Sequence, residues 1–272
     1  TTMNILTGFL EQTEGEVIID GFDTLKKPKK AKKEIGYMPE GVPLYTDLTV
    51  KEFVTYMAEI KQVDRKTRKE KVEKIIEQTG LKDVEKKLIK NLSRGYKQRV
   101  SMAGALVGEP KILILDEPTV GLDPKQITEI RNLIKELGKT HTIILSSHIL
   151  SEVSQICNKV IIINKGKIVA VDTPENLENK VNNNNCIYVM VEDTENKVEQ
   201  IKDKINGVKK IELVEENKDG TKQYLIEAEK DIDIRKTIFS EFAKENITIF
   251  EMKKADTTLE DAFMKLIEGG NK

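Results

Sequence analysis

The feature that most constrains this 272-residue chain is a short apolar run, Ile112 to Leu115, that leads directly into two adjacent acids. Four apolar residues followed by charge and proline are typical of a strand that is buried on both faces of a parallel sheet. Open α/β sheets bind ligands at the edge where their strands end, so Asp116 and Glu117 are candidate site residues. Because neighbours on a strand point to opposite faces, we expect one acid to face a phosphate-bound Mg²⁺ and the other to polarise an attacking water. The alternative is a strand that simply ends in a charged turn.

Charge and hydropathy argue against two kinds of direct partner. The chain carries 45 basic and 46 acidic residues, so it offers no electrostatic argument for a nucleic-acid partner. No apolar run approaches the ~20 residues that a membrane helix needs, and we expect a soluble chain that reaches a membrane only through another protein. Cys157 and Cys186 lie far apart without metal-ligand spacing, which fits a reducing compartment. We interpret the lysines between Lys26 and Lys33 as a solvent-exposed face.

The first part of the chain predicts short elements followed by a helical block. We expect a helix over residues 1–10, a short strand within residues 14–21, and another within residues 35–40 that runs into a proline-bearing loop. Thr49 and Glu52 have the spacing of a capping box before an apolar helical stripe. A second helix ends at Gly80. The stripes of both helices indicate packing rather than catalysis.

A further helix begins at Ser93, which is a natural N-cap residue, and Gly95 lies in its first turn. The exposed N–H groups and the positive dipole end of such a helix start can bind an anion. An ordinary cap is the alternative, and it is the commoner meaning of this pattern alone.

The segment after the acid pair predicts a helix and then another strand of the same sheet. The helix carries an apolar stripe from Ile127 to Leu137, and a buried strand follows over residues 142–145. His148 comes after that strand and therefore at the same sheet edge as the acids. A lone histidine at a strand end is usually structural, but its position beside the acidic strand favours a functional role. His141 precedes the strand and has no such position.

The C-terminal part of the chain has a different pattern. A hairpin over residues 160–171 is followed by the polar run Asn182 to Asn185, which we predict to be a linker. Strands and helices then follow in the order βαββαβ over residues 186–255, with a turn at Asp219-Gly220, and this order is the ferredoxin-like split arrangement. This part has no acid pair, metal-ligand spacing or Gly-rich loop, so we interpret it as a regulatory or docking module. A last amphipathic helix, over residues 256–272, should pack back on the body.

Taken together, the motifs resemble those of the ATP-binding-cassette (ABC) ATPases. Leu92 to Arg99 is similar to their signature motif, Ile112 to Glu117 to their Walker B strand, and Gly121 to Asp123 to their D-loop. His148 matches their switch histidine, and Tyr37 to Glu40 lies where their Q-loop falls. The βαββαβ part resembles the extension on cassette subunits that serve separate, small export permeases.

The resemblance covers about residues 1–175 and implies an α/β fold, the P-loop NTPase core of an ABC ATPase, over residues 1–181. Within it, a helical subdomain at about residues 44–92 would dock the permease. A ferredoxin-like α+β domain (186–255) and a C-terminal helix (256–272) follow.

The activity implied by the resemblance is hydrolysis of ATP, with Mg²⁺, to power a membrane transporter of the export type. In this family two cassettes sandwich two ATP molecules. The implied partners are therefore a membrane permease and a second ABC ATPase subunit in a homodimer, and no nucleic acid. The implied location is the cytoplasmic face of the cell membrane, as a peripheral protein.

Carried over residue by residue, the resemblance implies catalytic roles for Glu117, which would activate the attacking water, and for His148, which would contact the γ-phosphate. Asp116 would hold Mg²⁺ through water, and Glu40 is a second candidate for the metal. Ser93 and the Gly95 amide would close on the partner's nucleotide, and Asp123 would link the two sites across the dimer. The implied nucleotide-binding residues are Thr1, Thr2, Glu40, Ser93, Arg94, Gly95, Tyr96 and Asp123.

The chain departs from the family pattern at three places. Glu40 stands where the Q-loop has glutamine, and Arg94 and Tyr96 replace a glycine and the glutamine of the signature. The P-loop, G-x-x-x-x-G-K-[ST], does not occur in the printed sequence, and Thr1 and Thr2 look like the first residues after it. We therefore expect a truncated copy of an ATPase that is inactive by itself.

Two alternatives stay open on the sequence. One is a cassette protein of DNA repair or translation, although such proteins need a long coiled coil or two cassettes in one chain. The other is a non-catalytic subunit or fragment that lends only its signature motif to a partner's ATP site.

Overall fold

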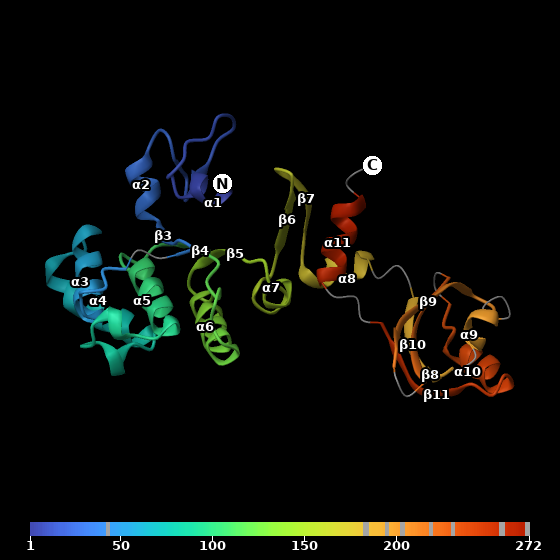
Figure 1. The fold of residues 1–272 in the computed structure, drawn as a ribbon. Coiled ribbons are helices and arrows are strands. Elements are labelled where there is room, and N and C mark those ends of the chain that lie inside the picture. The colour runs from blue at the N-terminus through green and yellow to red at the C-terminus, as the bar shows by residue number, and fades with distance from the viewer. Residues whose placement is uncertain are drawn as a thin grey trace. The chain divides into compact units, whose positions relative to one another are not determined.

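The computed structural model describes residues 1–41, 44–181, 185–193, 196–201, 205–217, 220–229, 232–255 and 259–269 (Figure 1). The chain forms two compact units, Thr1–Glu152 and Val153–Lys272. The sequence placed the first domain boundary later, near residue 181. The helix α11 (Leu259–Gly269) packs against α8 (Pro174–Val181) and β7 (Lys167–Asp172), and this contact groups the hairpin with the C-terminal part.

The first unit is built on a parallel sheet whose described strands are β3 (Ile35–Met38), β4 (Ile112–Asp116) and β5 (Thr142–Ser146), in that spatial order. The register aligns Met38 with Leu115 and Asp116 with Ser146, so the three strands end at one edge. The central strand β4 is buried through Leu113, Ile114 and Leu115. β5 is only half-buried, whereas we expected a buried strand, because it lies at the edge of the described sheet.

The two faces of this sheet are covered by different helices. Met3 and Leu6 of α1 (Thr2–Leu6) pack with Ile114 and Tyr37 on one face. On the other face lies α5 (Arg94–Leu106), and β3 approaches it so closely that a Cβ on Gly36 would come within 2.2 Å of the Ala105 carbonyl oxygen. Since side chains alternate along a strand, Asp116 belongs to the face of Ile114.

The N-terminal elements are shorter than the sequence suggested. The expected helix over residues 1–10 ends at Leu6, and Gly8 has a positive φ. The strands β1 (Ile18–Ile19) and β2 (Phe22–Asp23) form a small antiparallel hairpin. Asp20 and Gly21 make its turn with φ values of 47° and 78°, which is the conformation that two-residue hairpins favour. The lysine run forms part of α2 (Pro28–Lys33).

The helical block contains α3 (Val50–Ile60), α4 (Arg65–Gln78) and the short 3₁₀ turns η1 (Lys82–Val84) and η2 (Ile89–Asn91). The predicted capping box is present: the Glu52 amide donates to Thr49 Oγ1 at 3.2 Å, and the Thr49 amide donates to Glu52 Oε2 at 2.8 Å. Beyond the sheet strand β4, α6 (Pro124–Leu137) buries Ile130, Leu133, Ile134 and Leu137. The short helix α7 (Leu150–Ile156) follows β5.

The second unit starts within α7 and continues with the hairpin β6 (Val160–Asn164) and β7. Its four-stranded sheet has the order β11-β8-β10-β9, and all three described pairings are antiparallel. This is the order of a split βαββαβ arrangement. Its remaining elements are β8 (Asn185–Glu192), α9 (Lys197–Gln200), β9 (Val208–Glu216), β10 (Thr221–Ala228), α10 (Arg235–Lys244) and β11 (Thr248–Lys254). Most of the polar run predicted as a linker, residues 182–184, and Asp219 of the predicted turn lie outside the described residues.

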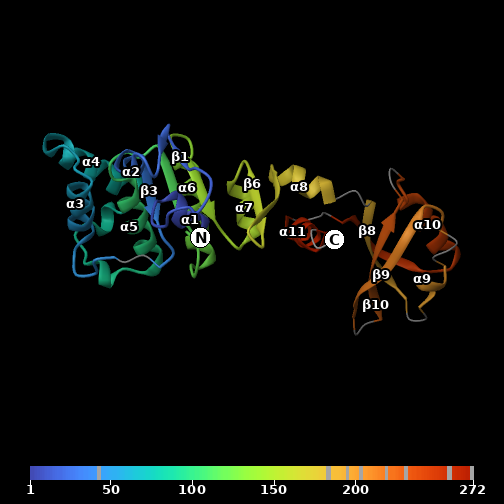
Figure 2. The same ribbon diagram turned by 90° about the horizontal axis from the view of Figure 1, so that it is seen from above.

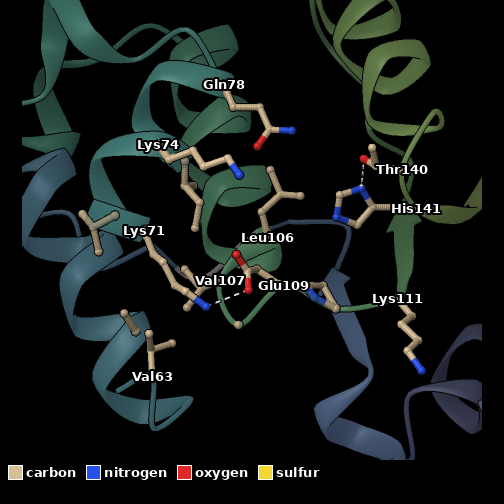
Figure 3. A pocket seen from close by; sticks show the side chains of 15 residues that line it. Val63, Lys71, Lys74, Gln78, Leu106, Val107, Glu109, Lys111, Thr140 and His141 are labelled. Carbon is tan, nitrogen blue, oxygen red and sulfur yellow. Dashed lines mark hydrogen bonds and ion pairs between the residues drawn. The ribbon is translucent and has the colours of Figure 1, made fainter. Parts of the chain in front are cut away.

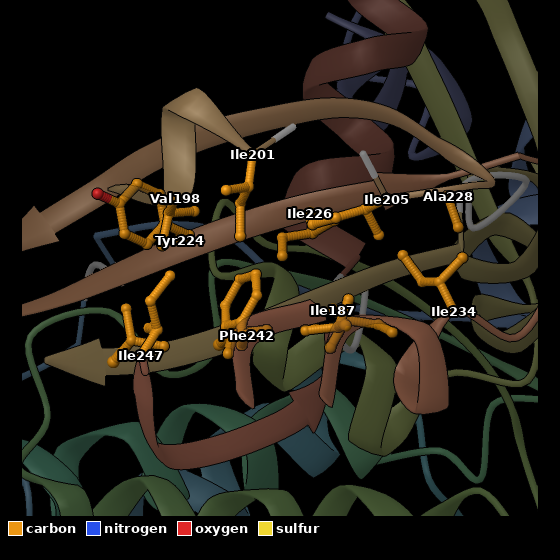
Figure 4. Close-up of a cluster of buried hydrophobic side chains, with 13 residues drawn as sticks. Ile187, Val198, Ile201, Ile205, Tyr224, Ile226, Ala228, Ile234, Phe242 and Ile247 are labelled. Carbon is orange, nitrogen blue, oxygen red and sulfur yellow. The ribbon is translucent and has the colours of Figure 1, made fainter. Parts of the chain in front are cut away.

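One face of this second sheet carries the core of the C-terminal part (Figure 4). Val189 and Val191 of β8, Ile226 of β10 and Phe242 of α10 are fully buried. Tyr224 adds a polar contact, because its hydroxyl donates to Asp193 Oδ2 at 2.8 Å. Burial, followed by this hydrogen bond, raises the pKa of Tyr224 well above its ordinary value. Figure 2 shows the elements of each unit from a second direction.

Within the residues that the structure describes, no helix combines the length and the apolar character that crossing a membrane requires.

The close approach of β3 to α5 yields a test of the packing. We expect Gly36→Ala to lower the free energy of unfolding by roughly 1–3 kcal/mol, because an added methyl group overpacks the contact with the Ala105 carbonyl. Urea denaturation followed by circular dichroism measures the change. Gly138→Ala is the matched control: its Cβ would stay at least 3.4 Å from other atoms, so its stability should be nearly unchanged. Equal effects in the two variants would contradict this account.

Candidate functional site

The acid pair lies at the carboxyl edge of the parallel sheet, and one serine organises it. Asp116 is the last residue of β4, and its register partner on β5 is Ser146. The Ser146 hydroxyl donates a short hydrogen bond to Asp116 Oδ1. Ser146 Oγ also accepts a hydrogen bond from the Glu117 amide at 3.1 Å. Ser146 therefore holds the Asp116 carboxylate and the Glu117 backbone at the same time.

Glu117 lies beyond the end of β4, so strand alternation does not explain why the side chains of Asp116 and Glu117 point in different directions. Its φ is 49°, in the left-handed region that non-glycine residues rarely adopt. The expectation that strand alternation alone would separate the two side chains was wrong, because the strand ends one residue earlier. The turn directs the Glu117 carboxylate to His148 instead, with 2.8 Å between Oε2 and Nδ1. Because of this backbone turn, Asp116 binds Ser146 whereas Glu117 binds His148.

The contact between Glu117 and His148 joins a sheltered carboxylate to an accessible ring. The side chain of Glu117 is 17% exposed and that of His148 is 64% exposed. His148 can therefore reach a ligand while Glu117 holds its other nitrogen. A carboxylate beside an exposed imidazole at a sheet edge can orient a water molecule and exchange a proton with it.

Tyr37 of β3 lies near enough to Asp116 to feel the charge of its carboxylate. Burial raises the pKa of its phenol, and the nearby charge of Asp116 adds to the effect. The hydroxyl therefore stays protonated beside the carboxylate. Tyr37 contributes an uncharged wall rather than a second acid.

Two further contacts fix the loop that follows the acids. Gln98 of α5 donates from Nε2 to the Pro118 carbonyl at 2.7 Å. Thr119 donates to Glu152 Oε2 at 2.6 Å, and both residues are buried. Breaking the hydrogen bond between Thr119 and Glu152 would leave buried polar groups without partners, which is costly. Residues 118–119 are therefore held by α7 as well as by α5.

Ser93 is the N-cap of α5, as predicted. The residues that lie against the start of α5 come from the loop after the acids and from the start of α6. The Tyr96 amide donates to Ser93 Oγ at 3.4 Å. A Cβ on Gly121 would come within 2.3 Å of Arg94 Cζ, so the guanidinium lies directly against that glycine. Gly95 similarly leaves room for Gln126 of α6. The signature-like and D-loop-like segments therefore form one cluster within the chain.

Two of the proposed nucleotide-binding residues are occupied by contacts within the chain. The Tyr96 hydroxyl donates to Asp83 Oδ2 at 2.8 Å, and this hydrogen bond raises the pKa of Tyr96. Asp123 caps α6 by accepting the Gln126 amide at 2.9 Å. Tyr96 thus faces the helical block, and Asp123 has a structural function whatever else it does.

The remaining sequence-based candidates lie outside these two clusters. Glu40 is exposed in the loop after β3, and the neighbouring residues 42 and 43 lie outside the described part of the chain. Because Met38 pairs with Leu115, this loop leaves the same sheet edge as the acids. Thr1 and Thr2 are exposed at the start of α1.

The donor set at this edge suits a metal ion that keeps most of its waters. Asp116 supplies a half-buried carboxylate whose Oδ1 is already oriented by Ser146. Over the described ranges, no three acids, histidines or cysteines are grouped as a metal cage. Mg²⁺ is commonly held by one or two carboxylates together with substrate phosphates. The site therefore fits Mg²⁺ that arrives with a nucleotide, and it does not resemble a dedicated all-protein metal site.

Sequence reasoning missed the residues that position the acids. Ser146 was assigned to no role, although it follows an apolar run predicted to lie beside the acidic strand, and that adjacency was an available signal. Gln98 lies within the signature-like segment but was given no role there, and Glu152 lies on a helix at a position that no motif distinguishes. Their roles depend on which loop packs against each helix, and this is a tertiary property.

Comparisons with known proteins agree on one family. A family model described as ABC transporter matches residues 1–120. The "Bacitracin transport ATP-binding protein BcrA" of Bacillus licheniformis is 32% identical over 99% of this chain and 85% of its own length. The "Uncharacterized ABC transporter ATP-binding protein YhcH" of Bacillus subtilis is 31% identical over 98% of this chain and 82% of its own length. Among solved structures, cbiO1 from Clostridium perfringens, described as part of the ABC transporter complex cbiONQ, matches with a TM-score of 0.59 and 29% identity over 66% of this chain and 77% of that chain.

The role of Ser146 can be tested at the backbone of its neighbour. We expect Ser146→Ala to raise the exchange rate of the Glu117 amide by about tenfold or more, because the lost acceptor costs roughly 1–3 kcal/mol. Hydrogen–deuterium exchange resolved by NMR measures this rate. Ser146→Thr keeps the hydroxyl and should retain the protection. An unchanged Glu117 exchange rate in Ser146→Ala would show that the hydroxyl does not hold this turn.

Proposed function

The chain belongs to the ABC transporter family, as an ATP-binding subunit that hydrolyses ATP, and on this premise we propose that it powers export through a separate membrane permease. The contact that supports the catalytic part of the proposal is the one between Glu117 and His148 at the carboxyl edge of the sheet. In this contact the partly buried carboxylate of Glu117 lies next to the exposed imidazole of His148.

In this proposal Glu117 orients the attacking water and accepts its proton. A general base must lie within hydrogen-bond reach of the group that it serves, and the turn at Glu117 directs its carboxylate out of the sheet edge toward His148. His148 steadies that carboxylate through Nδ1 and presents its exposed ring to the terminal phosphate. Such catalysis depends on positioning and charge rather than on a covalent intermediate.

Asp116 is the residue proposed to hold Mg²⁺, through water, with Glu40 as a second candidate from the adjoining loop. When bound, the metal supplies positive charge that offsets the charge of the phosphates. Ser146 keeps the Asp116 carboxylate in one orientation, and the neutral Tyr37 adds no competing charge. Thr1 and Thr2 are proposed to contact the phosphates from the start of α1.

The second half of the nucleotide site is proposed to come from another subunit of the same kind. Ser93 and Gly95 would approach the partner's nucleotide with the positive end of α5. Arg94 adds a cation to this surface, and its position against Gly121 connects the surface to the loop that carries Asp123. Tyr96 is proposed to support this surface from the side, since its hydroxyl is bonded to Asp83.

The permease is proposed to dock on the helical block, residues 44–92, on the cytoplasmic face of the membrane. Gln98 supports a mechanical connection, because it joins α5 to the backbone that follows the acids. Export is favoured by the C-terminal part, whose βαββαβ order resembles the extension of subunits that serve small export permeases. We propose a docking or regulatory role for that part.

The proposal predicts that ATP hydrolysis depends on Glu117. In the full-length gene product we expect Glu117→Gln to lower the hydrolysis rate by about 10²-fold or more, because the proton acceptor is lost, while ATP still binds. Phosphate release measures hydrolysis, and binding of a fluorescent ATP analogue measures affinity.

The matched control is Glu136→Gln, which removes an exposed acid of α6 that pairs only with Lys139 among the described residues. It should hydrolyse ATP at the unchanged rate. If the full-length protein shows no hydrolysis, and Glu117→Gln alters neither rate nor binding, the catalytic proposal fails. A non-catalytic subunit that lends only its signature segment would then be the better account.

A further inference from the structure

A cavity of about 400 Å³ opens in the first unit, away from the acid pair (Figure 3). Its walls come from α3, α4, the end of α5 and the residues that immediately precede β4 and β5. The apolar part of the lining consists of Ala58, Val63, Val72, Ile75, Leu106, Val107 and Pro110. The polar part consists of Lys71, Lys74, Gln78, Glu109, Lys111, Thr140 and His141.

The cavity lies at the opposite edge of the sheet from the candidate nucleotide site. Lys111 directly precedes β4, and His141 directly precedes β5, whereas Asp116 and Ser146 end the same two strands. A strand of five residues at about 3.3 Å per residue separates its ends by roughly 13 Å. A ligand in the cavity would therefore leave the acid pair free.

The lysines that line the cavity are not equivalent. Lys71 pairs with Glu109 at 2.7 Å, and Lys111 pairs with Asp20 at 2.6 Å. In the described part of the chain, Lys74 has no direct ion pair, and its charge acts on Glu109 only from a distance. The cavity thus offers one ammonium group whose charge is not matched by a contacting carboxylate.

Two further polar side chains accompany Lys74. Gln78 lies one turn further along α4, on the same face of the helix. The opposite wall carries His141, whose Nδ1 lies 3.1 Å from the Leu137 carbonyl oxygen and 2.8 Å from Thr140 Oγ1. Both of the described contacts of the ring involve Nδ1, and Nε2 lies on the other side of the ring. In Figure 3, Lys74 and Gln78 reach into the cavity from one side and His141 from the other.

We propose that this cavity is a binding site for a small organic monocarboxylate with an apolar body. The carboxylate would pair with Lys74 and accept from the Gln78 amide, and the apolar body would lie on the floor formed by Val72, Ile75 and Leu106. Ligand sites of this kind are concave and mostly apolar, with a few polar groups that fix orientation. The inference does not depend on the proposed function.

The charge balance selects a carboxylate over a phosphate. Only Lys74 is left without a contacting acid in the described residues of the lining, and Glu109 adds a negative charge nearby. A phosphate dianion is usually held by several cations or by a helix N-terminus. Because two of the three lining lysines are already paired with acids, the one unmatched ammonium group suits a single negative charge.

The test is titration of the full-length protein with octanoate by isothermal titration calorimetry. We expect saturable binding at one site per chain, and we expect neither 1-octanol nor inorganic phosphate to bind there at the same concentrations. Lys74→Met, which keeps the aliphatic stem, should weaken octanoate binding by about tenfold or more. Lys69→Met removes an exposed lysine of the same helix that does not line the cavity, and it should leave the affinity unchanged.

Several results would overturn the proposal. Equal binding of 1-octanol would mean that the carboxylate is not recognised, and preferential binding of phosphate would mean that the ligand class is wrong. Equal weakening by Lys74→Met and Lys69→Met would indicate a general charge effect. A second variant, Gln78→Leu, should also weaken octanoate binding, and unchanged affinity in both Gln78→Leu and Lys74→Met would exclude this cavity. The effect of an ATP analogue on octanoate affinity should be small, which separates the cavity from the nucleotide site.

Discussion

The hydrogen bonds of one serine hydroxyl determine the arrangement of the acid edge. Ser146 donates to the Asp116 carboxylate and accepts the Glu117 amide, so the last residue of β4 and the first residue of the turn are held from β5. This contact requires the parallel register that sets Asp116 opposite Ser146. The Ser146 contact also lies next to an unusual backbone conformation, the positive φ of Glu117. A positive φ at a glutamate costs free energy, which neighbouring contacts must offset. Displacing β5 by one residue would remove the hydroxyl from both partners.

The loop after the acids is held from three directions. Gln98 binds its backbone from α5, Glu152 binds Thr119 from α7, and Arg94 lies against Gly121. These contacts connect α5 directly to the residues next to Glu117, and in the proposed function a movement of α5 would act on those residues. This gives a physical basis for coupling between a surface at the start of α5 and chemistry at the sheet edge, which is the coupling that an ATPase subunit of a transporter needs.

The same two strands also connect the acid edge to a second, chemically different place. Their amino ends contribute Lys111 and His141 to a cavity with an apolar floor, and their carboxyl ends carry Asp116 and Ser146. His141 had no evident role in the sequence, because a histidine before a strand carries no motif. In the structure its Nδ1 contacts the Leu137 carbonyl oxygen and Thr140 Oγ1, and Lys74 and Gln78 of α4 lie across the cavity from it.

The sequence by itself determined the local features of this protein. The apolar run ending in Asp116 and Glu117, the capping box at Thr49 and the N-cap at Ser93 follow from periodicity and side-chain chemistry, and each is present in the structure. The ordered motifs were also sufficient to identify the family, since several together are far more specific than one. Only the tertiary structure decided that Glu117 turns to His148, that Ser146 bridges the acids, and that the Tyr96 hydroxyl binds Asp83 of the helical block. The physical reason is that these contacts join residues from different elements, and their geometry depends on strand register and helix packing, which local sequence patterns do not encode.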